Sequence, residues 1–235
     1  MIIQARTSSS RLPGKVLQKV RGKILLDYLV ERLVKCRNID AIVIATSNEP
    51  EDDAIVRYCN ERSLHCRRGP LNDVATRIRG VVESLALPAF VRINGDSPLL
   101  DPALVDEGVK AFHEKGCGLL TNVFPRSYPK GQSVEVIRTG VFLQGCAEMF
   151  DDGDREHVTS VFYRNPERFG VKNLHIEGAS RAEVRMCVDT PTDLARFEGV
   201  VDKMSRDHAD YSLEELFYLF ETAEEDLHSA GGTGA

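Results

Sequence analysis

Short apolar runs alternate with segments of helical spacing along most of this 235-residue chain, and this alternation limits the fold more than any other feature. Residues 41–45 (AIVIA) are apolar throughout, as in a strand that is buried on both faces. The segment before this run, 24–35, carries apolar residues at helical spacing, and a second helix is expected at 48–62. Such alternation predicts an α/β fold of three layers, with a mainly parallel sheet and helices on both faces.

The remaining elements follow the same pattern. They are strands at 2–5, 64–67, 89–93, 171–176 and 184–188, and helices at 72–84, at 101–115 and from Thr190 and Ser212 onward. The pattern loosens over 121–168, where one strand is expected near 134–137. We therefore expect a single domain over 1–228, followed by a glycine-rich flexible tail at 229–235.

Composition and charge exclude several classes of protein. No apolar run approaches the roughly 18 residues of a membrane helix, and the six cysteines form no CxxC pair. The net charge of −6 argues against a general nucleic-acid binder. We therefore expect a cytoplasmic protein with free thiols that binds neither membranes nor nucleic acids.

The charge is distributed unevenly along the chain. Six cations precede the first acidic residue, Asp27, so the first 26 residues carry +6 although the whole chain carries −6. A basic segment on an acidic protein favours a local site for an anion over a diffuse basic surface. A solvated basic loop is the alternative.

Three loops that follow predicted strands carry polar residues suited to catalysis, and ligands of open parallel sheets bind beyond these strand ends. The first loop, 4–15 (QARTSSSRLPGK), combines small residues with the cations Arg6, Arg11 and Lys15. Small residues allow backbone N–H groups to approach an anion. The loop is not a Walker A motif, because Val16 follows the lysine. Taken alone, a phosphate site and a solvated loop explain it equally well.

The other two loops supply carboxylates. Gly95 permits a sharp turn directly after a predicted strand, and Asp96 then points beyond the strand end, although an Asx turn or helix cap would also suit it. In the third loop, 188–193 (VDTPTD), Asp193 fits a helix-capping position, whereas Asp189 has no such structural role. Two carboxylates beside a phosphate cradle suit Mg²⁺, which usually takes one or two carboxylates together with phosphate oxygens and waters.

Five motifs occur in order over most of the chain. They are 3–15 (IQARTSSSRLPGK), 94–102 (NGDSPLLDP), 122–131 (NVFPRSYPKG), 155–159 (REHVT) and 188–194 (VDTPTDL). Together they resemble the CMP-sugar synthetase family of cytidylyltransferases. The branch of the spore-coat polysaccharide biosynthesis F-type proteins looks closest, and 3-deoxy-manno-octulosonate cytidylyltransferases and CMP-N-acetylneuraminate synthetases are more distant.

The resemblance implies a fold like that of the nucleotide-diphospho-sugar transferases, with CTP and Mg²⁺ as cosubstrate and cofactor. CMP would pass to the hydroxyl of an acidic sugar with release of pyrophosphate, for surface polysaccharide biosynthesis. By this resemblance Arg6, Arg11 and Lys15 cradle the CTP phosphates, and Asp96 and Asp189 hold Mg²⁺. Further contacts with the nucleotide are expected from Gln4, Ala5, Ser10, Arg77 and Asn94.

The acceptor site is expected within 121–168, the region where the strand and helix pattern loosens. A sugar acid needs a cation for its carboxylate and polar groups for its hydroxyls. The candidates are Arg126, Glu135, Arg155 and His157. A helix start at Arg155 and a core position for His157 are the alternatives. In relatives such a region also helps to form a dimer, so we expect a homodimer.

Two positions depart from the relatives. Thr76 precedes Arg77 where relatives often have Asp, and Cys187 stands where an aromatic residue or a second carboxylate often precedes the metal ligand. Cys187 is therefore consistent with a single carboxylate at Asp189. Two other functions remain open: transfer to a phosphonate or sugar phosphate, and a nucleotide-binding module without turnover.

Overall fold

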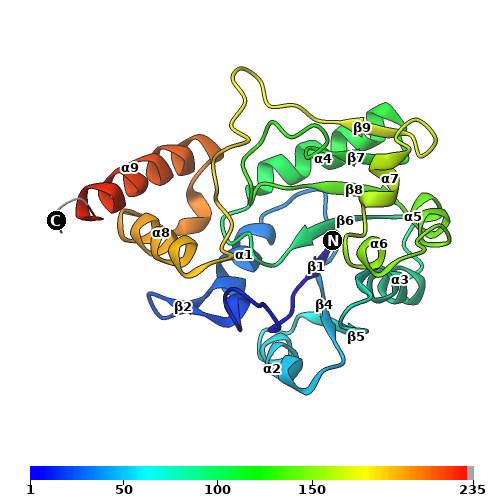
Figure 1. Cartoon of the computed structure of the whole chain (residues 1–235), viewed down its shortest axis with the longest axis horizontal. Coiled ribbons are helices and arrows are strands. Elements are labelled where there is room, and N and C mark those ends of the chain that lie inside the picture. Colours follow the sequence, from blue (N-terminus) through cyan, green and yellow to red (C-terminus); the bar gives the residue numbers. More distant parts are fainter. Residues whose placement is uncertain (232–235) are drawn as a thin grey trace.

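A seven-stranded sheet forms the centre of the molecule (Figure 1). The computed structural model describes the backbone of residues 1–231 and the side chains of residues 1–224. The strand order is β5-β4-β1-β6-β8-β7-β9, and only β8 runs antiparallel to its neighbours in this sheet. The strands are β1 (Ile2–Gln4), β4 (Val43–Ser47), β5 (His65–Gly69), β6 (Ala89–Asn94), β7 (Leu119–Thr121), β8 (Glu135–Arg138) and β9 (Val171–Asn173). The expected mainly parallel sheet is confirmed.

The chain changes direction across the sheet between β1 and β6. From β1 it proceeds to β4 and β5 on one side, and it then returns to place β6 on the other side of β1. Gln4 and Asn94 lie opposite each other in the parallel register at the carboxyl ends of these two strands. Ligands of open α/β sheets bind at such a reversal of strand order, so the fold itself marks this point.

Gly95 is required where β6 ends. Its N–H donates to the carbonyl oxygen of Gln4 at 2.9 Å. A Cβ at this position would lie 2.9 Å from that same carbonyl oxygen, closer than side chains allow. The missing side chain therefore lets β6 turn tightly against β1 and brings Asp96 to the end of the sheet.

Helices cover both faces of the sheet. Successive residues of β1 point to opposite faces, so that Ile3 packs in one hydrophobic cluster and Ile2 in the other. The first cluster includes residues of α1 (Leu25–Leu33), α2 (Asp53–Glu61) and α4 (Pro102–Lys115). The second includes residues of α3 (Val74–Ser84), α5 (Thr139–Cys146) and α7 (Ser160–Arg164). The predicted three-layer arrangement is confirmed.

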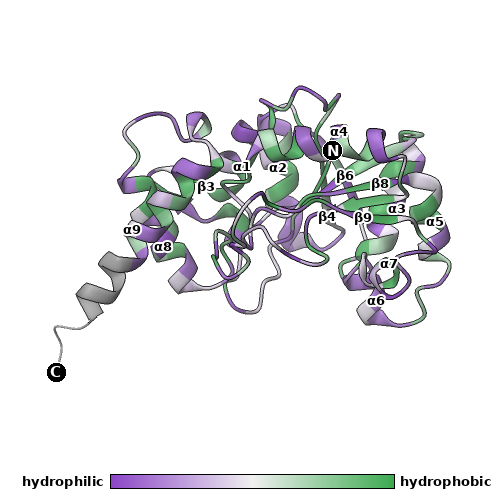
Figure 2. Cartoon of the chain, turned by 90° about the horizontal axis from the view of Figure 1, so that it is seen from above, coloured by the Kyte–Doolittle hydropathy of each residue, from purple (hydrophilic) through white to green (hydrophobic). Residues whose placement is uncertain are grey.

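The last two helices form a third hydrophobic cluster at one end of the molecule (Figure 2). They are α8 (Pro191–Asp202) and α9 (Leu213–Gly231), and they pack with α1 and the small hairpin of β2 (Lys19–Val20) and β3 (Lys23–Ile24). The rings of Tyr28 and Phe197 meet edge to face, with centroids 5.1 Å apart. The capping boxes expected at Thr190 and Ser212 are present.

Four expectations need correction. Residues 184–188 form no strand of the sheet, because only Arg185 makes an isolated bridge, with Lys130. The strand expected at 171–176 is shorter, and the loosened region contains α5, α6 (Asp152–Glu156) and α7 besides β8. Helix α9 continues to Gly231, so the first three residues of the expected tail are helical. Residues 232–235 of that tail lie outside the described part of the chain.

Within the described residues, no helix has the length and apolar character needed to cross a membrane.

Candidate active site

The loop after β1 is held in shape by a buried carboxylate. Asp52, in the 3-10 turn η2 (Pro50–Asp52), accepts hydrogen bonds from the backbone N–H and the hydroxyl of Thr7, both at 2.7 Å. It also accepts from the N–H and the hydroxyl of Ser47 at the end of β4. Burial raises the pKa of Asp52, but the hydrogen bonds from Ser47 and Thr7 outweigh burial and leave it below its ordinary value. Asp52 therefore stays charged and fixes the loop to the sheet.

The far end of the same loop is tied to Thr7. The N–H of Gly14 donates to the carbonyl oxygen of Thr7 at 2.8 Å. Gly14 has a φ of 67°, a left-handed conformation that favours glycine. Lys15 follows directly and begins the 3-10 turn η1 (Lys15–Leu17). The loop is thus closed at both ends, with Arg6 beside one end and Lys15 beside the other.

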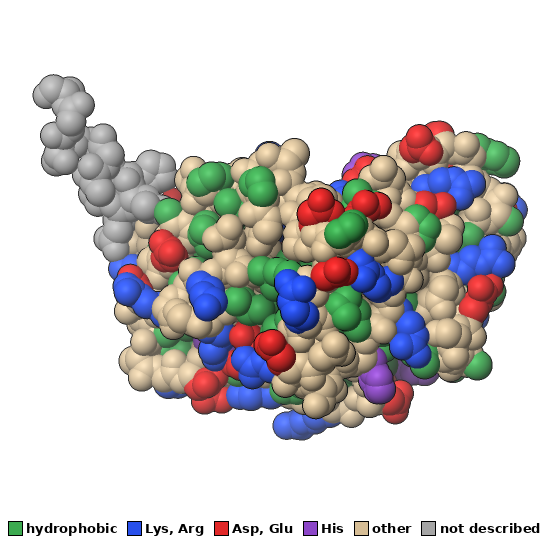
Figure 3. Space-filling view, turned by 90° about the horizontal axis from the view of Figure 1, so that it is seen from below, with side chains coloured by type: hydrophobic (Ala, Val, Ile, Leu, Met, Phe, Trp, Pro, Cys, Tyr) green, Lys and Arg blue, Asp and Glu red, His purple; other side chains and the backbone are tan. Residues whose placement is uncertain are grey.

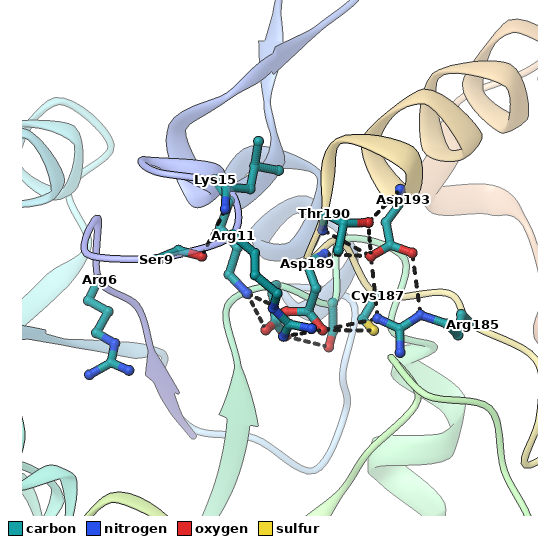
Figure 4. A network of polar contacts seen from close by, with 12 residues as sticks. Arg6, Ser9, Arg11, Lys15, Arg185, Cys187, Asp189, Thr190 and Asp193 are labelled. Carbon is teal, nitrogen blue, oxygen red and sulfur yellow. Dashed lines mark hydrogen bonds and ion pairs between the residues drawn. The ribbon is translucent and has the colours of Figure 1, made fainter.

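Lys15 joins the two carboxylates that the sequence predicted as metal ligands (Figure 4). Its Nζ lies 2.7 Å from Oδ2 of Asp96 and 2.7 Å from Oδ1 of Asp189. Burial lowers the pKa of Lys15, but Asp96 and Asp189 outweigh burial and hold it above its ordinary value. Burial likewise raises the pKa of Asp189, and the bonds from Lys15 outweigh this and keep it low. The ammonium and the carboxylate of Asp189 are therefore both charged at neutral pH.

The two carboxylates fit a hydrated divalent ion. Oxygens of Asp96 and Asp189 both contact the single nitrogen of Lys15, so one cation can touch both side chains. No cluster of three or more His, Cys, Asp or Glu suited to a metal exists among the described residues. Mg²⁺ needs no such cluster, because it commonly takes one or two carboxylates with phosphate oxygens and waters.

Arg185 is a site residue that the sequence analysis missed. Its Nη2 lies 3.1 Å from Oδ2 of Asp189 and 3.3 Å from Oδ2 of Asp193. Asp193 forms the capping box of α8 together with Thr190. Asp189 therefore has one oxygen turned to Lys15 and the other held by Arg185 (Figure 4). Arg185 lies in an irregular segment, so no spacing in the sequence predicts this contact.

Cys187 lies beside the same carboxylate. Its Sγ is 3.8 Å from Oδ2 of Asp189. Burial, followed by the charges of Asp96 and Asp189, raises the pKa of Cys187 to about 12. The thiol is therefore neutral at neutral pH, and Asp189 is the carboxylate beside it that contacts Lys15.

A cavity of about 330 Å³ opens at the switch point between β1 and β6. Most of the residues predicted to bind the nucleotide and metal line it: Gln4, Ala5, Arg6, Arg11, Lys15, Arg77, Asn94 and Asp96. Ser10 and Asp189 line an adjoining cavity of about 410 Å³, which also includes Arg6, Arg11 and Lys15. The structure therefore brings the predicted nucleotide and metal residues together.

Arg6 and Arg11 take different positions at this site. Arg11 Nη2 is 3.5 Å from Oδ2 of Asp189, so it belongs to the metal-side network. Arg6 stands apart from that network (Figure 4) and bonds Glu156 at 2.7 Å. Glu156, from α6, lines both cavities and was missed by the sequence analysis because it is distant along the chain from the loop that it contacts.

Arg77 is buried at the wall of the nucleotide cavity without hydrogen-bond partners for two of its nitrogens. It is 3% exposed, and within the described part of the chain its Nε and Nη1 bond to nothing. Burial, then the positive charges of Arg6 and Arg92, lower the pKa of Arg77 to about 10. The buried Oδ1 of Asn94 also lacks a partner among the described residues. Unpaired buried polar groups cost about 1–3 kcal/mol each, so their presence at a cavity wall points to a ligand.

A second cavity, of about 290 Å³, lies next to the first. It includes three of the four residues predicted to bind the acceptor, Arg126, Glu135 and His157. Arg126 donates to the carbonyl oxygen of Pro129 at 3.2 Å and to the hydroxyl of Ser133 at 3.1 Å. Burial lowers the pKa of Arg126. No carboxylate pairs with Arg126 among the side chains that the structure describes, so it is available for an anion.

Arg155 does not line this cavity, in contrast to the expectation from the sequence. Its guanidinium donates to Oδ2 of Asp73 at 2.9 Å and to the carbonyl oxygen of Met149. Asp73 caps α3 by accepting from the N–H of Thr76. Arg155 therefore stabilises the contact between α6 and α3 instead of reaching the acceptor cavity.

Arg92 connects the two cavities and was also missed. It lines both, it bonds Glu135, and its Nε donates to the side chain of Gln4 at 2.9 Å. A signal was present in the sequence, since Arg92 lies two residues before Asn94 on β6. Strand alternation places residues at this spacing on the same face.

This geometry defines a class of protein. A mainly parallel α/β sheet, a cation-bearing loop after its first strand and a pair of carboxylates facing that loop are the arrangement of a nucleotidyltransferase. A family profile described as cytidylyltransferase matches residues 1–216. The chain belongs to the cytidylyltransferase family.

Known proteins agree with this assignment. The spore coat polysaccharide biosynthesis protein SpsF of Bacillus subtilis is 30% identical over 224 residues, which cover 93% of this chain and 92% of SpsF. A cytidylyltransferase structure from Leptospira borgpetersenii has a TM-score of 0.88 at 24% identity and covers 97% of this chain and 94% of its own. A CMP:2-keto-3-deoxy-manno-octonic acid synthetase complexed with CTP has a TM-score of 0.65 at 16% identity, over 86% and 97%. The family and SpsF confirm the resemblance drawn from the motifs, and the structures confirm the fold.

Proposed function

We propose that this protein transfers CMP from CTP to the hydroxyl of an acidic sugar, with Mg²⁺ as its metal and with release of pyrophosphate. The observation that carries the proposal is the contact of Lys15 with both Asp96 and Asp189, beside a loop that Asp52 fixes to the sheet. A phosphate-binding cation and two metal-binding carboxylates thereby meet at one point. Phosphoryl transfer requires positioning and charge neutralisation of this kind, without a covalent intermediate.

The polyphosphate half of the site rests on three cations and two carboxylates. Arg6, Arg11 and Lys15 would hold the triphosphate, and Asp96 and Asp189 would hold Mg²⁺. Mg²⁺, when bound, would neutralise phosphate charge and favour departure of pyrophosphate. The protein's own contribution is to keep these five side chains on a rigid strand end, a capped helix and a closed loop.

The base-binding half rests on the two unpartnered polar groups. Arg77 offers N–H donors at the cavity wall, and Asn94 offers an acceptor oxygen. Cytosine carries acceptors at O2 and N3 and a donor at its N4 amino group, so it can satisfy both residues. A uracil base lacks that amino donor. Gln4, Ala5 and Ser10 line the same pair of cavities and complete the proposed contacts.

The acceptor would occupy the second cavity. Arg126 supplies a cation without a carboxylate partner among the described residues, which suits the carboxylate of a sugar acid. Ser133 and Tyr163 offer hydroxyls, and Glu135 offers carboxylate oxygens, for hydrogen bonds to the sugar. The octonic acid substrate of the synthetase similar in fold supports an acidic sugar, and the role of SpsF in spore coat polysaccharide biosynthesis supports a surface polysaccharide as the final product.

We also propose a homodimer and a cytoplasmic location. Phe150 is 88% exposed and Phe124 is 42% exposed, and both lie within the region 121–168 that is proposed to form the dimer. The six cysteines are free, as in a reducing compartment.

The experiment for the proposed activity measures pyrophosphate release with CTP, UTP, ATP and GTP, with Mg²⁺ and a panel of acidic sugars, sugar phosphates and phosphonates. Release is expected with CTP and at least one acidic sugar. Glu61→Gln, at an exposed position on α2, is the matched control and should keep the full rate. Release only with a sugar phosphate or phosphonate would contradict the acidic-sugar proposal. CTP binding without release from any acceptor would indicate a module without turnover.

A further inference from the structure

The nucleotide and acceptor cavities share only a few lining residues. Of those that line the two cavities of about 330 and 290 Å³, Arg92, Asn94 and His157 belong to both. In the proposed reaction, the attacking hydroxyl lies in one cavity and the α-phosphorus in the other. Bond formation must therefore take place where the cavities meet, beside these three residues.

Only one of the three can accept a proton near neutral pH. Arg92 is a permanent cation that bonds Glu135 and Gln4, and the amide of Asn94 does not titrate. Histidine changes its charge close to neutral pH and is the usual general base of enzymes. We infer that His157 removes the proton from the attacking hydroxyl, an inference that rests on the proposed function.

The nearby carboxylates are already held by cations. Glu135 bonds Arg92 and Tyr163, Glu156 bonds Arg6, and Asp96 bonds Lys15. Each of these carboxylates already has a hydrogen-bond or ion-pair partner, so a side chain without one is better placed to take the hydroxyl proton. The ring of His157, in contrast, makes no hydrogen bond or ion pair with any residue that the structure describes.

The backbone of His157 is fixed, although its ring is exposed. Its N–H donates to the carbonyl oxygen of Gly153 at 2.8 Å, and its carbonyl oxygen accepts from the N–H of Ser160 at 2.7 Å. These bonds join the end of α6 to the start of α7 and set the direction of the side chain. Exposure to solvent gives the ring a route for releasing the proton after each turnover.

The step balances in atoms and electrons. A ring nitrogen of neutral His157 takes the proton from the acceptor hydroxyl, whose oxygen uses a lone pair to bond the α-phosphorus of CTP. The bond from that phosphorus to the bridging oxygen breaks, and pyrophosphate leaves with the electron pair. The imidazolium then loses its proton to solvent.

Several charged groups share these cavities with His157. They are the cations Arg6, Arg11, Lys15, Arg77, Arg92 and Arg126, the anions Asp96, Glu135 and Glu156, and the phenol of Tyr163.

The test compares wild type with His157→Gln over a range of pH, using CTP, Mg²⁺ and the acceptor found active with the wild type. We expect kcat to fall by roughly 10²–10⁴-fold, the usual contribution of a general base, and the acidic limb of the kcat profile to disappear. The KM for each substrate should change less than about threefold, since a base acts mainly in the transition state. In His157→Gly, added imidazole should restore part of kcat.

Controls separate this role from binding and from folding. His65→Gln, at an exposed position on β5, should keep the wild-type profile, and calorimetric titration should give equal CTP affinity for His157→Gln and wild type. A kcat within threefold of wild type with the acidic limb intact would overturn the inference. A rise in the acceptor KM with unchanged kcat would also overturn it, in favour of a binding role. If the wild type releases no pyrophosphate, the proposed function fails, and the inference fails with it.

Discussion

Lys15 places its ammonium 2.7 Å from the carboxylate of Asp96, and the same nitrogen lies equally close to Asp189. The two carboxylates best suited to a divalent cation therefore already share one cation of the protein. A metal ion that contacts both must replace Lys15 there, and a triphosphate offers Lys15 an alternative anion. Metal binding and nucleotide binding are thus expected to favour each other.

Lys15→Met should bind metal more tightly than wild type when no nucleotide is present. Removal of the competing cation leaves the charges of Asp96 and Asp189 to the metal, and about a tenfold gain in Mn²⁺ affinity is expected, or about 1.4 kcal/mol. Electron paramagnetic resonance of free Mn²⁺ measures this directly. The same variant should bind CTP more weakly. Equal Mn²⁺ affinity in the two proteins would show that Lys15 does not compete with the metal.

Arg77→Met should weaken CTP binding without loss of stability. The substitution removes two buried nitrogens that have no partner among the described residues, so the free energy of unfolding should stay equal or rise. The lost contacts to the base should raise the Kd for CTP by about tenfold to a hundredfold, and discrimination against UTP should fall. Calorimetric titration and thermal unfolding check both effects. An unchanged Kd would remove Arg77 from the base-binding site.

Asp52→Asn should destabilise the protein in a pH-dependent way. The amide cannot accept all four hydrogen bonds that the carboxylate accepts from Thr7 and Ser47, and a loss of about 1–3 kcal/mol in the free energy of unfolding is expected at pH 7. The pKa of Asp52 is lower in the folded protein than its ordinary value of 3.8. Its contribution is therefore complete above about pH 5 and declines as the pH falls through the folded pKa.

Urea unfolding at a series of pH values tests this sign. The difference between wild type and Asp52→Asn should be largest at neutral pH and should shrink below pH 4. A difference that is constant with pH would contradict a charged Asp52 as the anchor of the loop. Glu51→Gln, one residue earlier at an exposed position of η2, provides the matched control.

Phe150→Asp should convert the proposed dimer to a monomer. A charge at this highly exposed aromatic position would be costly to bury in an interface. Tyr218→Asp, 67% exposed on α9 and outside 121–168, should leave the dimer intact. Sedimentation equilibrium measures both masses. A wild-type mass equal to one chain would refute the dimer.

The charged surface agrees with a confined anion site. On the face seen in Figure 3, basic and acidic side chains are interspersed and form no broad field of one sign. Arg6, Arg11 and Lys15, three of the six cations that precede Asp27, in contrast line one cavity at the switch point. The uneven charge of the sequence therefore reflects, in part, a cradle inside the molecule.

Local patterns account for the parts of the fold that the sequence predicted. The apolar run at 41–45 predicts a strand, and the helical spacing of apolar residues on either side of it predicts helices. Both patterns depend only on residues close in sequence, and their alternation predicts the parallel sheet. The polar motifs, such as the one that contains Gly95 and Asp96, directly follow the carboxyl ends of strands. The sheet brings these strand ends close together. Residues 184–188 alternate as a strand would, but Met186 and Val188 pack against α8 and α9 instead of joining the sheet.

The missed residues depend on contacts between distant segments. Arg185 holds Asp189 from an irregular loop, and Glu156 reaches Arg6 across 150 positions of the chain. Arg155 and His157 are separated by one residue, yet helix α6 ends between them, so one side chain holds α3 and the other enters the cavities. No spacing in the sequence distinguishes two such neighbours.

The central claim is that Asp96 and Asp189 together support Mg²⁺-dependent transfer from CTP. The most direct measurement is the rate of pyrophosphate release by Asp96→Asn and Asp189→Asn, titrated with Mg²⁺ in the presence of CTP and the acceptor. Both variants should remain folded, should bind CTP, and should lose at least about a hundredfold in rate, equivalent to about 2.7 kcal/mol. Near-normal rates in both variants would contradict the claim.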